Sequence, residues 1–497
     1  MTQLASGTPA AAQDRHRPTL HFTVRRGWVN DPYGVVYSDG RYHMFFQYNP
    51  DGTTWSPRCH WGHAISADLV HWTEMAVALT PDESEIGCWS GSTVVAADGQ
   101  PTILYTRIAN ADWGLGQVAL ARGSADLTTW QRDPLTSVIT GPPPDLGGTA
   151  FRDPYVWHTG THWTMVMGIG LPGGVGAAVQ YRSDDLVEWS YTGIIAQRST
   201  NDTDDVWTGT LWECPQLIEV GATWVLLVSV WDDDVLHYVA YALGDYDGCE
   251  FTARTWGRFT HGDQLYAMSA FRDTDGRPCV MSWFRERDSI TPPDSPFAGA
   301  ISLTRTLAVR GDNLIAELHP FGHSGWSWRL EDTSPDLAAS PLTATVSTAP
   351  TQIRLIYATG GAGLVVLTRT GTDGSQTLRL SLDVAARALT VEGAAGDFLL
   401  RAPLDPTRPE GTITVVLDAD LLELTSTGVS GMATARIPHG AGTIRLSGVG
   451  LHIHAVLGIA DVTRISGLHR DPADVAAEKV PVPPSEETTT RDATAEC

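Results

Sequence analysis

The chain has 497 residues, 42% of them hydrophobic, which is long enough for two or three domains with substantial cores. Lys and Arg number 33 against 57 Asp and Glu, so the formal net charge is −24. A surface this acidic repels phosphate backbones and anionic lipids, which argues against nucleic-acid and membrane partners and favours a neutral small molecule.

Residues 1–18 contain no continuous apolar run of the kind that a signal peptide carries, and no stretch of the sequence is apolar over the length of a membrane span. We therefore expect a flexible N-terminus and a cytoplasmic protein; a secreted protein is the alternative if this sequence is a processed form. The six cysteines have no CxxC pair and no regular spacing, which favours free thiols over a disulfide framework.

Residues 19–322 repeat one pattern five times. Each copy has two apolar runs joined by a turn that ends in glycine, and successive turn glycines are 59, 61, 61 and 55 residues apart: Gly40, Gly99, Gly160, Gly221 and Gly276. Each copy predicts a β-hairpin, because glycine supplies the positive φ of a tight turn. Four strands per repeat with no helical period predict a five-bladed β-propeller. A long β-sandwich with recurring turns is the alternative, which five copies in phase disfavour.

The pattern changes after the fifth repeat. Residues 323–342 are expected to form a linker, and residues 343–468 contain short alternating strands with frequent turns, which predict a β-sandwich domain. Residues 469–497 are rich in Pro, Thr and acidic residues and are expected to be disordered. The predicted fold class is therefore all-β, a five-bladed β-propeller followed by a C-terminal β-sandwich.

Three acidic residues stand near the start of the first strand of a predicted blade. In a propeller this strand lines the central channel, and its start faces a funnel that all blades share. Asp31 in "WVNDPYG", Asp153 in "FRDP" and Glu213 in "WECP" lie nine, seven and eight residues before their turn glycines. Ser90 and Ser269 take the corresponding place in the other two blades. We therefore expect three carboxylates to meet in one funnel.

Three carboxylates around one funnel suit the cleavage of a glycosidic bond. Cleavage with retention needs a nucleophile and an acid/base about 5–5.5 Å apart. Asp31, on an Asn-Asp-Pro turn, suits an ionised nucleophile, and Glu213, in a partly apolar setting, suits an acid that stays protonated near neutral pH. Asp153 would then bind sugar hydroxyls, with Arg152 holding its geometry.

Each carboxylate also has a simpler interpretation. Asp31 could cap its own turn, and Glu213 could be a rim residue paired with Arg152; the common register of the three carboxylates disfavours both. Asp133 and Asp273 occur in similar stretches, "RDP" and "FRD". Asp133 follows Trp130 and is expected near the outer edge of its blade, and Asp273 lies in a hairpin turn, so neither is expected in the funnel.

Other polar clusters do not require a ligand. His60 and His63 have an H-x-x-H spacing, which on a strand places them on opposite faces, and no further Cys or His partners follow. The acidic runs 202–205 and 232–234 could bind calcium but are more often solvated loops. The sequence has no phosphate loop or dinucleotide fingerprint, and we expect neither a cofactor nor a metal.

At these residues the chain resembles glycoside hydrolase family 32, which contains invertases, levanases, inulinases and fructosyltransferases. "WVNDPYG" is similar to the family's Trp-Met-Asn-Asp-Pro-Asn-Gly, "FRDP" and "ECP" match directly, and "HWGHAISADLVHW" and "CWSGS" are similar to intervening segments. The resemblance extends from residue 21 to about residue 462. It implies the same fold, a five-bladed propeller followed by a β-sandwich.

The resemblance also implies roles for individual residues. Asp31 would be the nucleophile, Asp153 the transition-state stabiliser and Glu213 the acid/base. Six further residues would surround the terminal fructose: Asn30, Gln47, Trp55, Trp89, Ser90 and Arg152. Tyr33 and Trp89 are bulkier than the Asn and Phe that the family commonly has there, and we expect them to reshape the pocket.

The sequence thus predicts a retaining β-fructofuranosidase that acts on sucrose or short fructans, with a small sugar as its partner. A homo-oligomer is compatible with the sequence. One alternative is a fructosyltransferase, which uses the same residues with a sugar hydroxyl in place of water. Others are a non-catalytic fructan-binding protein and a related arabinosidase, to which the motifs are less similar.

Overall fold

The computed structural model describes residues 17–460 of the protein with several gaps. The residues left out within that range are 97, 134–136, 287–294, 321–325, 333–341, 347–348, 359–363, 372–373, 375, 384, 387, 394–397, 404–409, 428–429, 438–441 and 450–452. The expected flexible N-terminus (except its last residues) and the expected disordered tail, 469–497, therefore lie outside the described residues.

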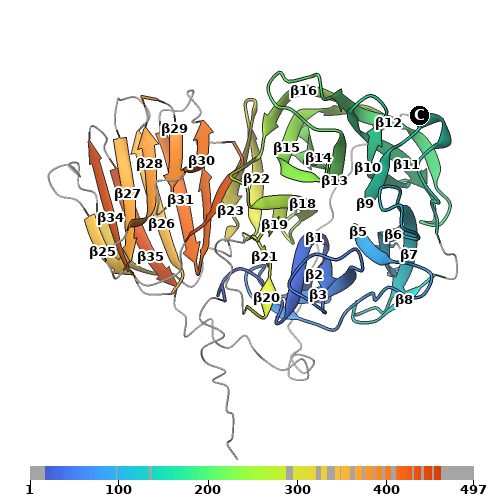
Figure 1. The fold of residues 1–497 in the computed structure, drawn as a ribbon, viewed down its shortest axis with the longest axis horizontal. Helices are drawn as coiled ribbons and strands as arrows, with labels where there is room; N and C mark the ends of the chain where they lie inside the picture. The colour runs from blue at the N-terminus through green and yellow to red at the C-terminus, as the bar shows by residue number, and fades with distance from the viewer. Residues whose placement is uncertain are drawn as a thin grey trace, which may run out of the picture.

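Five sheets of mainly antiparallel strands stand in a ring (Figure 1). The first contains β1 (Gly27–Ser38), β2 (Arg41–Asn49), β3 (His60–Ser66) and β4 (Trp72–Glu74), and the second β5 (Gly87–Val95), β6 (Pro101–Ile108), β7 (Gln117–Gly123) and β8 (Trp130–Arg132). After the short 3-10 helix η1 (Pro144–Leu146), the third contains β9 (Ala150–His158), β10 (Trp163–Leu171), β11 (Val175–Ser183) and β12 (Ser190–Ser199).

The fourth sheet contains β13 (Leu211–Val220), β14 (Thr223–Asp232), β15 (Val235–Tyr246) and β16 (Phe251–Arg258). The fifth contains β18 (Leu265–Arg272), β19 (Pro278–Phe284), β22 (Arg305–Arg310) and β23 (Asn313–Leu318), with β21 (Ala300–Ile301) beside β19. The ring closes where β20 (Phe297–Ala298), which follows the fifth blade's first hairpin, pairs in parallel with β1 of the first blade. The prediction of a five-bladed propeller is confirmed.

The predicted turns explain the strand pattern. All five turn glycines have positive φ, between 66° and 97°, as tight hairpins require. Three blades also have a turn with the sequence Ser-x-Asp-Leu, at residues 66–69, 124–127 and 183–186. Its leucine has positive φ and is buried in each case, namely Leu69, Leu127 and Leu186. Apolar side chains fill the space between each pair of neighbouring blades, so the core is a set of five interfaces.

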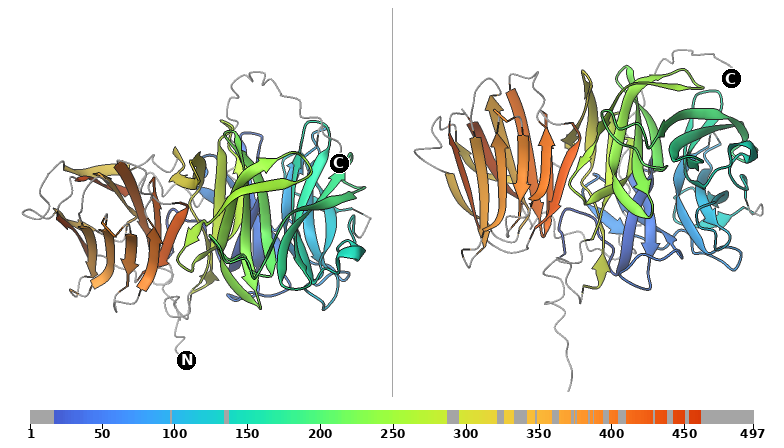
Figure 2. Two further views of the ribbon diagram at one scale, coloured as in Figure 1. Left: turned by 90° about the horizontal axis from the view of Figure 1, so that it is seen from above. Right: turned by 45° about the horizontal axis from the view of Figure 1, so that its top comes forward.

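The remaining strands form a β-sandwich, coloured orange to red at one side of the ring in Figures 1 and 2. One sheet has the order β17-β33-β32-β31-β26-β35-β24 and the other β25-β34-β27-β28-β29-β30. Their bounds are β17 (Thr260–His261), β24 (Trp326–Asp332), β25 (Leu342–Val346), β26 (Thr351–Ala358), β27 (Leu364–Gly371), β28 (Gln376–Asp383), β29 (Ala388–Glu392), β30 (Phe398–Pro403), β31 (Glu410–Asp418), β32 (Leu421–Ser426), β33 (Met432–Arg436), β34 (Gly442–Val449) and β35 (Ile453–Ala460).

Two elements depart from the expected domain layout. Strand β24 lies inside the expected linker, 323–342, but pairs antiparallel with β35 and forms an edge of the first sandwich sheet. Strand β17 comes from the propeller half of the chain and pairs in parallel with β33 at the opposite edge of that sheet. Backbone hydrogen bonds between β17 and β33 therefore join the propeller to the sandwich.

A buried network of charges also joins the two domains. The carboxylate of Asp418 accepts the backbone N–H groups of residues 19–21, and its Oδ2 lies 2.9 Å from Nδ1 of His21. Nε2 of His21 lies 2.9 Å from Oε1 of Glu423, which also pairs with Arg305 of the fifth blade. Burial opposes the charge of His21, but the bonds to Asp418 and Glu423 outweigh it and raise the pKa of His21 to about 9.

Most of the cysteines that the structure describes are free thiols. Cys59, Cys88, Cys214 and Cys279 are free and buried, as expected. Cys249 forms a disulfide bond, so the expectation of free thiols is wrong for that residue. Within the part of the chain that the structure describes, no helix has the length and apolarity needed to span a bilayer.

Candidate active site

The first strand of every blade is interrupted near its start by a β-bulge. The last paired residues before the bulge are Asn30, Trp89, Arg152, Glu213 and Tyr266. The residues that follow them, inside the bulge, are Asp31, Ser90, Asp153, Cys214 and Ala267. Four of these have positive φ, from 25° at Asp31 to 65° at Asp153. A bulge redirects side chains, and here it does so at the same level in all five blades.

The pairing corrects the register that was counted from the turn glycines. Glu213 is equivalent to Arg152 and not to Asp153, and the fifth blade presents Tyr266 and Ala267 at this level in place of Ser269. The bulge residue lies nine residues before the turn glycine in the first, second and fifth blades and seven before it in the third and fourth, so no single count identifies equivalent positions.

The starts of these strands surround a cavity of about 980 Å³. Asp31 from β1, Asp153 from β9 and Glu213 from β13 all line it. The other lining residues are Trp28, Asn30, Gln47, Trp55, Trp89, Trp113, Gly114, Thr149, Ala150, Arg152, Thr210, Leu211, Trp231, Asp232, Asp233, Asp234, Leu236, Tyr266 and Trp283. The cavity thus combines carboxylates with flat indole faces, which suits a sugar.

Asp31 is held by three polar side chains. Asn30 Nδ2 donates to Oδ1 at 2.9 Å, and Ser90 Oγ donates to Oδ2 at 2.7 Å. Gln47 Nε2 lies 3.3 Å from the same Oδ2. Burial raises the pKa of Asp31 to about 6, although the hydrogen bonds from Ser90 and Asn30 favour the ionised form. The carboxylate is therefore fixed in direction and ionised above that pH.

Asp153 lies deeper, with 6% of its surface exposed. Its Oδ2 accepts the backbone N–H of Cys214 at 2.9 Å, and the Cys214 thiol lies 3.6 Å from that oxygen and 3.9 Å from Asp31 Oδ2. Burial, followed by the charge of Glu213, raises the pKa of Asp153 to about 7, while Arg152 opposes the shift. Burial also raises the pKa of the Cys214 thiol well above its usual value. The thiol therefore remains a donor between two carboxylates.

Glu213 is oriented by two donors. Arg152 Nε donates to Oε1 at 2.9 Å, and the Tyr266 hydroxyl donates to Oε2 at 2.6 Å. Burial and the charge of Glu213 raise the pKa of Tyr266 well above its usual value, so the phenol stays neutral. Arg152 was expected to hold Asp153, but its hydrogen bond is to Glu213.

Most of the predicted substrate contacts line the cavity, namely Asn30, Gln47, Trp55, Trp89 and Arg152. Ser90 does not: only 2% of its surface is exposed, and it reaches the site through Asp31. Tyr33 does not line the cavity either, because it packs in the core with its ring centroid 4.3 Å from that of Trp61. The expectation that Tyr33 reshapes the pocket is therefore wrong, whereas Trp89 does form part of the wall.

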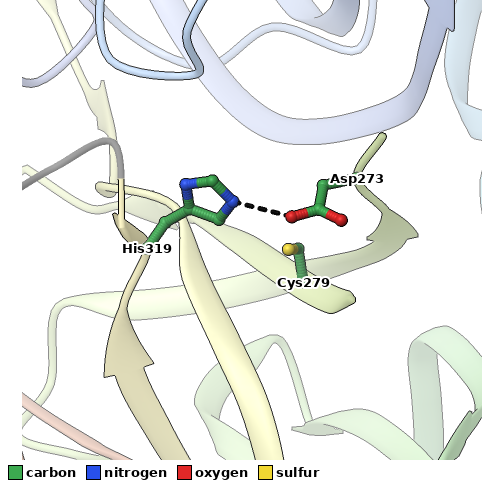
Figure 3. A group of neighbouring side chains, drawn as sticks. All are labelled: Asp273, Cys279 and His319. Atoms are coloured by element: carbon green, nitrogen blue, oxygen red, sulfur yellow. Dashed lines mark hydrogen bonds and ion pairs between the residues drawn. The ribbon is translucent and has the colours of Figure 1, made fainter. Parts of the chain in front are cut away.

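Asp273, in the "FRD" stretch, serves its own turn. Its Oδ1 accepts the backbone N–H groups of Asp275 and Arg277, at 3.0 and 2.8 Å. Its Oδ2 accepts Arg277 Nε at 2.6 Å and lies 2.9 Å from His319 Nε2, with Cys279 nearby (Figure 3). These three neighbours, Asp273, Cys279 and His319, could share a metal ion by distance alone, but the carboxylate is already paired with a guanidinium.

His60 and His63 are buried side chains of β3. His63 Nε2 lies 3.0 Å from His43 Nδ1, and its ring stacks on Phe45 at 4.6 Å. Burial, together with the facing His43, lowers the pKa of His63 to about 3. Both residues behave as neutral core histidines.

Comparison with known proteins agrees with this geometry. The sequence model of the glycosyl hydrolases family 32 N-terminal domain matches residues 21–317. The chain belongs to glycoside hydrolase family 32. This confirms the resemblance seen in the three motifs. The matched residues of this family 32 protein are those of the propeller, which carries the cavity.

Relatives and solved structures extend the comparison. The chain is 31% identical to the sucrose-6-phosphate hydrolase of Zymomonas mobilis over 328 residues, which are 60% of this chain and 61% of that enzyme. It is 33% identical to β-fructofuranosidase, insoluble isoenzyme 1, of Oryza sativa over 322 residues, 58% of this chain and 53% of that enzyme. The matches therefore span less than two thirds of either relative's length.

The fold of this family 32 protein matches a solved structure, that of a Bombyx mori GH32 β-fructofuranosidase variant in complex with sucrose. The TM-score is 0.75 at 24% sequence identity, over 90% of this chain and 98% of that chain. Because the match covers 90% of this chain, it extends beyond the propeller into the sandwich.

Proposed function

We propose that the protein is a retaining β-fructofuranosidase that hydrolyses terminal β-D-fructosyl bonds of sucrose and short fructans. The observation that carries the proposal is the convergence of Asp31, Asp153 and Glu213, from three blades, on one cavity. Support comes from the curated relatives, which are a sucrose-6-phosphate hydrolase and a β-fructofuranosidase, and from a structural neighbour that binds sucrose.

In this proposal Asp31 is the nucleophile. Its ionised carboxylate attacks the anomeric carbon of the fructosyl unit and forms a covalent fructosyl-enzyme. The donors on both of its oxygens, Asn30 and Ser90, fix the direction of attack. They also stabilise the Asp31 carboxylate that is regenerated when water releases the fructosyl unit in the second step.

Glu213 is the acid and then the base. It protonates the glycosidic oxygen as the bond to the fructosyl carbon breaks, and its carboxylate then takes a proton from the water that releases fructose. Arg152 and Tyr266 each hold one of its oxygens, so the side chain returns to the same position in both steps. The proton balance closes within one turnover.

Asp153 stabilises the transition state. We propose that it accepts hydrogen bonds from sugar hydroxyls while positive charge develops on the ring, as an oxocarbenium-like transition state requires. Its Oδ2 is held by the backbone of Cys214, and the neighbouring Asp31 adds a second negative charge. The attraction between these carboxylates and the ring strengthens as the ring becomes cationic.

The test is an analysis of products from sucrose, kestose, inulin and levan. Hydrolysis predicts free fructose, released initially as the β-anomer, which NMR detects before mutarotation. Release of the α-anomer would contradict retention. Oligofructosides as the main product at high sucrose would identify a fructosyltransferase, and binding without turnover would identify a binding protein.

A further inference from the structure

The cavity wall has an unbalanced charge. Among the described residues that line it, six are carboxylates: Asp31, Asp153, Glu213, Asp232, Asp233 and Asp234. The same set contains one cation, Arg152, and neither lysine nor histidine. That guanidinium is already bonded to Glu213. No free positive charge on this wall therefore remains to receive an anionic substrate group.

Three of these six carboxylates are consecutive in the sequence, at residues 232–234. Glu213 of β13 pairs with Ser229 of β14, and β14 continues three residues farther, to Asp232. Asp233 and Asp234 then form the turn to β15, with φ of 47° and 60°, and both are exposed. This acidic turn, residues 232–234, therefore follows the strand that pairs with Glu213 and lines the same cavity.

The proposed chemistry places the leaving group on the side of the cavity where Glu213 lies. Glu213 must contact the glycosidic oxygen in order to protonate it, so the departing sugar lies next to Glu213 and passes the acidic turn. Arg285 is a described cation close to this wall, and its guanidinium donates to the carbonyl of Leu236 at 2.8 Å and faces the Tyr266 ring. It is held by backbone carbonyls behind the cavity wall and does not line it.

We infer that the acidic turn is a specificity element that selects substrates with a neutral leaving sugar and rejects those with a phosphorylated one. This inference rests on the proposed function. A neutral sugar can donate hydroxyl hydrogen bonds to the three carboxylates, whereas a phosphate dianion meets like charges and finds no free cation among the described residues of the wall. Similarity to a sucrose-6-phosphate hydrolase therefore does not extend to the choice of substrate.

The experiment compares kcat/KM for sucrose and for sucrose 6-phosphate at low ionic strength, with the full-length protein. We expect sucrose to be preferred by at least about tenfold. The double variant Asp233→Asn/Asp234→Asn keeps side chains that tolerate positive φ and should narrow this preference at least about threefold. Added salt should narrow the preference of the unmodified protein as well, because it screens exposed charges.

A matched control removes the same charge elsewhere. Asp39→Asn/Asp184→Asn also deletes two exposed carboxylates, one of them at positive φ, in turns that follow the far ends of β1 and β11. The preference of this control for sucrose over sucrose 6-phosphate should equal that of the unmodified protein. If both double variants narrow that preference equally, the assignment to the acidic turn is overturned. Equal or better use of sucrose 6-phosphate would overturn the inference but leave the fructofuranosidase proposal standing. Cleavage of neither substrate would overturn the proposed function itself.

Discussion

Ser90 provides the sharpest test of how the site tunes its nucleophile. Its hydroxyl is 2% exposed, donates to Asp31 Oδ2 at 2.7 Å and accepts from Gln47 at 2.7 Å. A hydrogen bond to a charged group contributes roughly 1.5–3 kcal/mol, and 1.36 kcal/mol corresponds to about one pKa unit. Gln47 Nε2 already lies 3.3 Å from the same oxygen and offsets part of the loss. Ser90→Ala should therefore raise the pKa of Asp31 from about 6 by roughly one unit.

The assay is the pH profile of kcat/KM for sucrose. Activity requires ionised Asp31, so a higher pKa moves the acid limb of the profile upward. Below both limbs, near pH 5, the variant should be about tenfold slower than the unmodified protein, and the two should converge at alkaline pH. The charges of Glu213 and Asp31 both raise the pKa of Asp153, so the fitted value belongs to the group of carboxylates, and its upward displacement is the prediction.

A serine without this bond is the control. Ser229 is buried beside Glu213 in the β13–β14 ladder, and its hydroxyl has no hydrogen-bond partner in the structure. Ser229→Ala should leave the acid limb where it is. An unmoved acid limb in Ser90→Ala, with both proteins folded, would refute the reasoning that Ser90 stabilises the ionised nucleophile.

The remaining predictions concern the acid/base, its partner and the domain junction. Glu213→Gln should lower the rate of sucrose hydrolysis by about 10²–10⁴-fold and Asp31→Asn should lower it further; near-normal rates in either variant would remove the assignment. Tyr266→Phe deletes a donor to Glu213 and should lower kcat about tenfold with an unchanged unfolding midpoint; an unchanged kcat would show that the phenol does not position Glu213. The pKa of His21 is raised from 6.5 to about 9, so its contribution to stability is fully present below pH 6.5 and is lost as pH rises through 9, by about 3 kcal/mol. Urea unfolding between pH 6 and pH 10 should show this decline in the unmodified protein, and the decline should be absent from His21→Gln.

The sequence was sufficient for the fold because the information for it is local. Each blade repeats a turn that needs positive φ, and glycine at that place identifies the turn without any tertiary contact. The charged junction could not be predicted in this way. His21 and Glu423 are 402 residues apart, and neither residue stands in a pattern that indicates a partner.

The sequence predicts those site residues that stand in recognisable motifs. Asp31, Asp153 and Glu213 stand in distinctive stretches, and all three line the cavity. Tyr266 was missed because the count selects Ser269, seven residues before Gly276, whereas the bulge of the fifth blade begins at Ala267, nine residues before that glycine. Strand pairing would have found it, because it takes the place that Arg152 takes in the third blade.

The composition of the acidic run 232–234 favours a solvated loop, since nothing in it shows that β14 pairs with the strand of Glu213. The family resemblance implies a substrate contact at Ser90, whereas the structure has its buried hydroxyl bonded to Asp31. Both differences depend on where a strand ends or which way a side chain faces, and a sequence motif fixes neither.

Trapping the covalent intermediate tests the central claim most directly. An activated donor such as β-D-fructosyl fluoride needs no acid to leave, so Glu213→Gln should form the fructosyl-enzyme quickly and hydrolyse it slowly. Peptide mass spectrometry of the quenched protein should then find one fructosyl unit on Asp31, and none after Asp31→Asn is added. A fructosyl unit on any other residue, or turnover of the activated donor by the double variant at the rate of Glu213→Gln, would contradict the account.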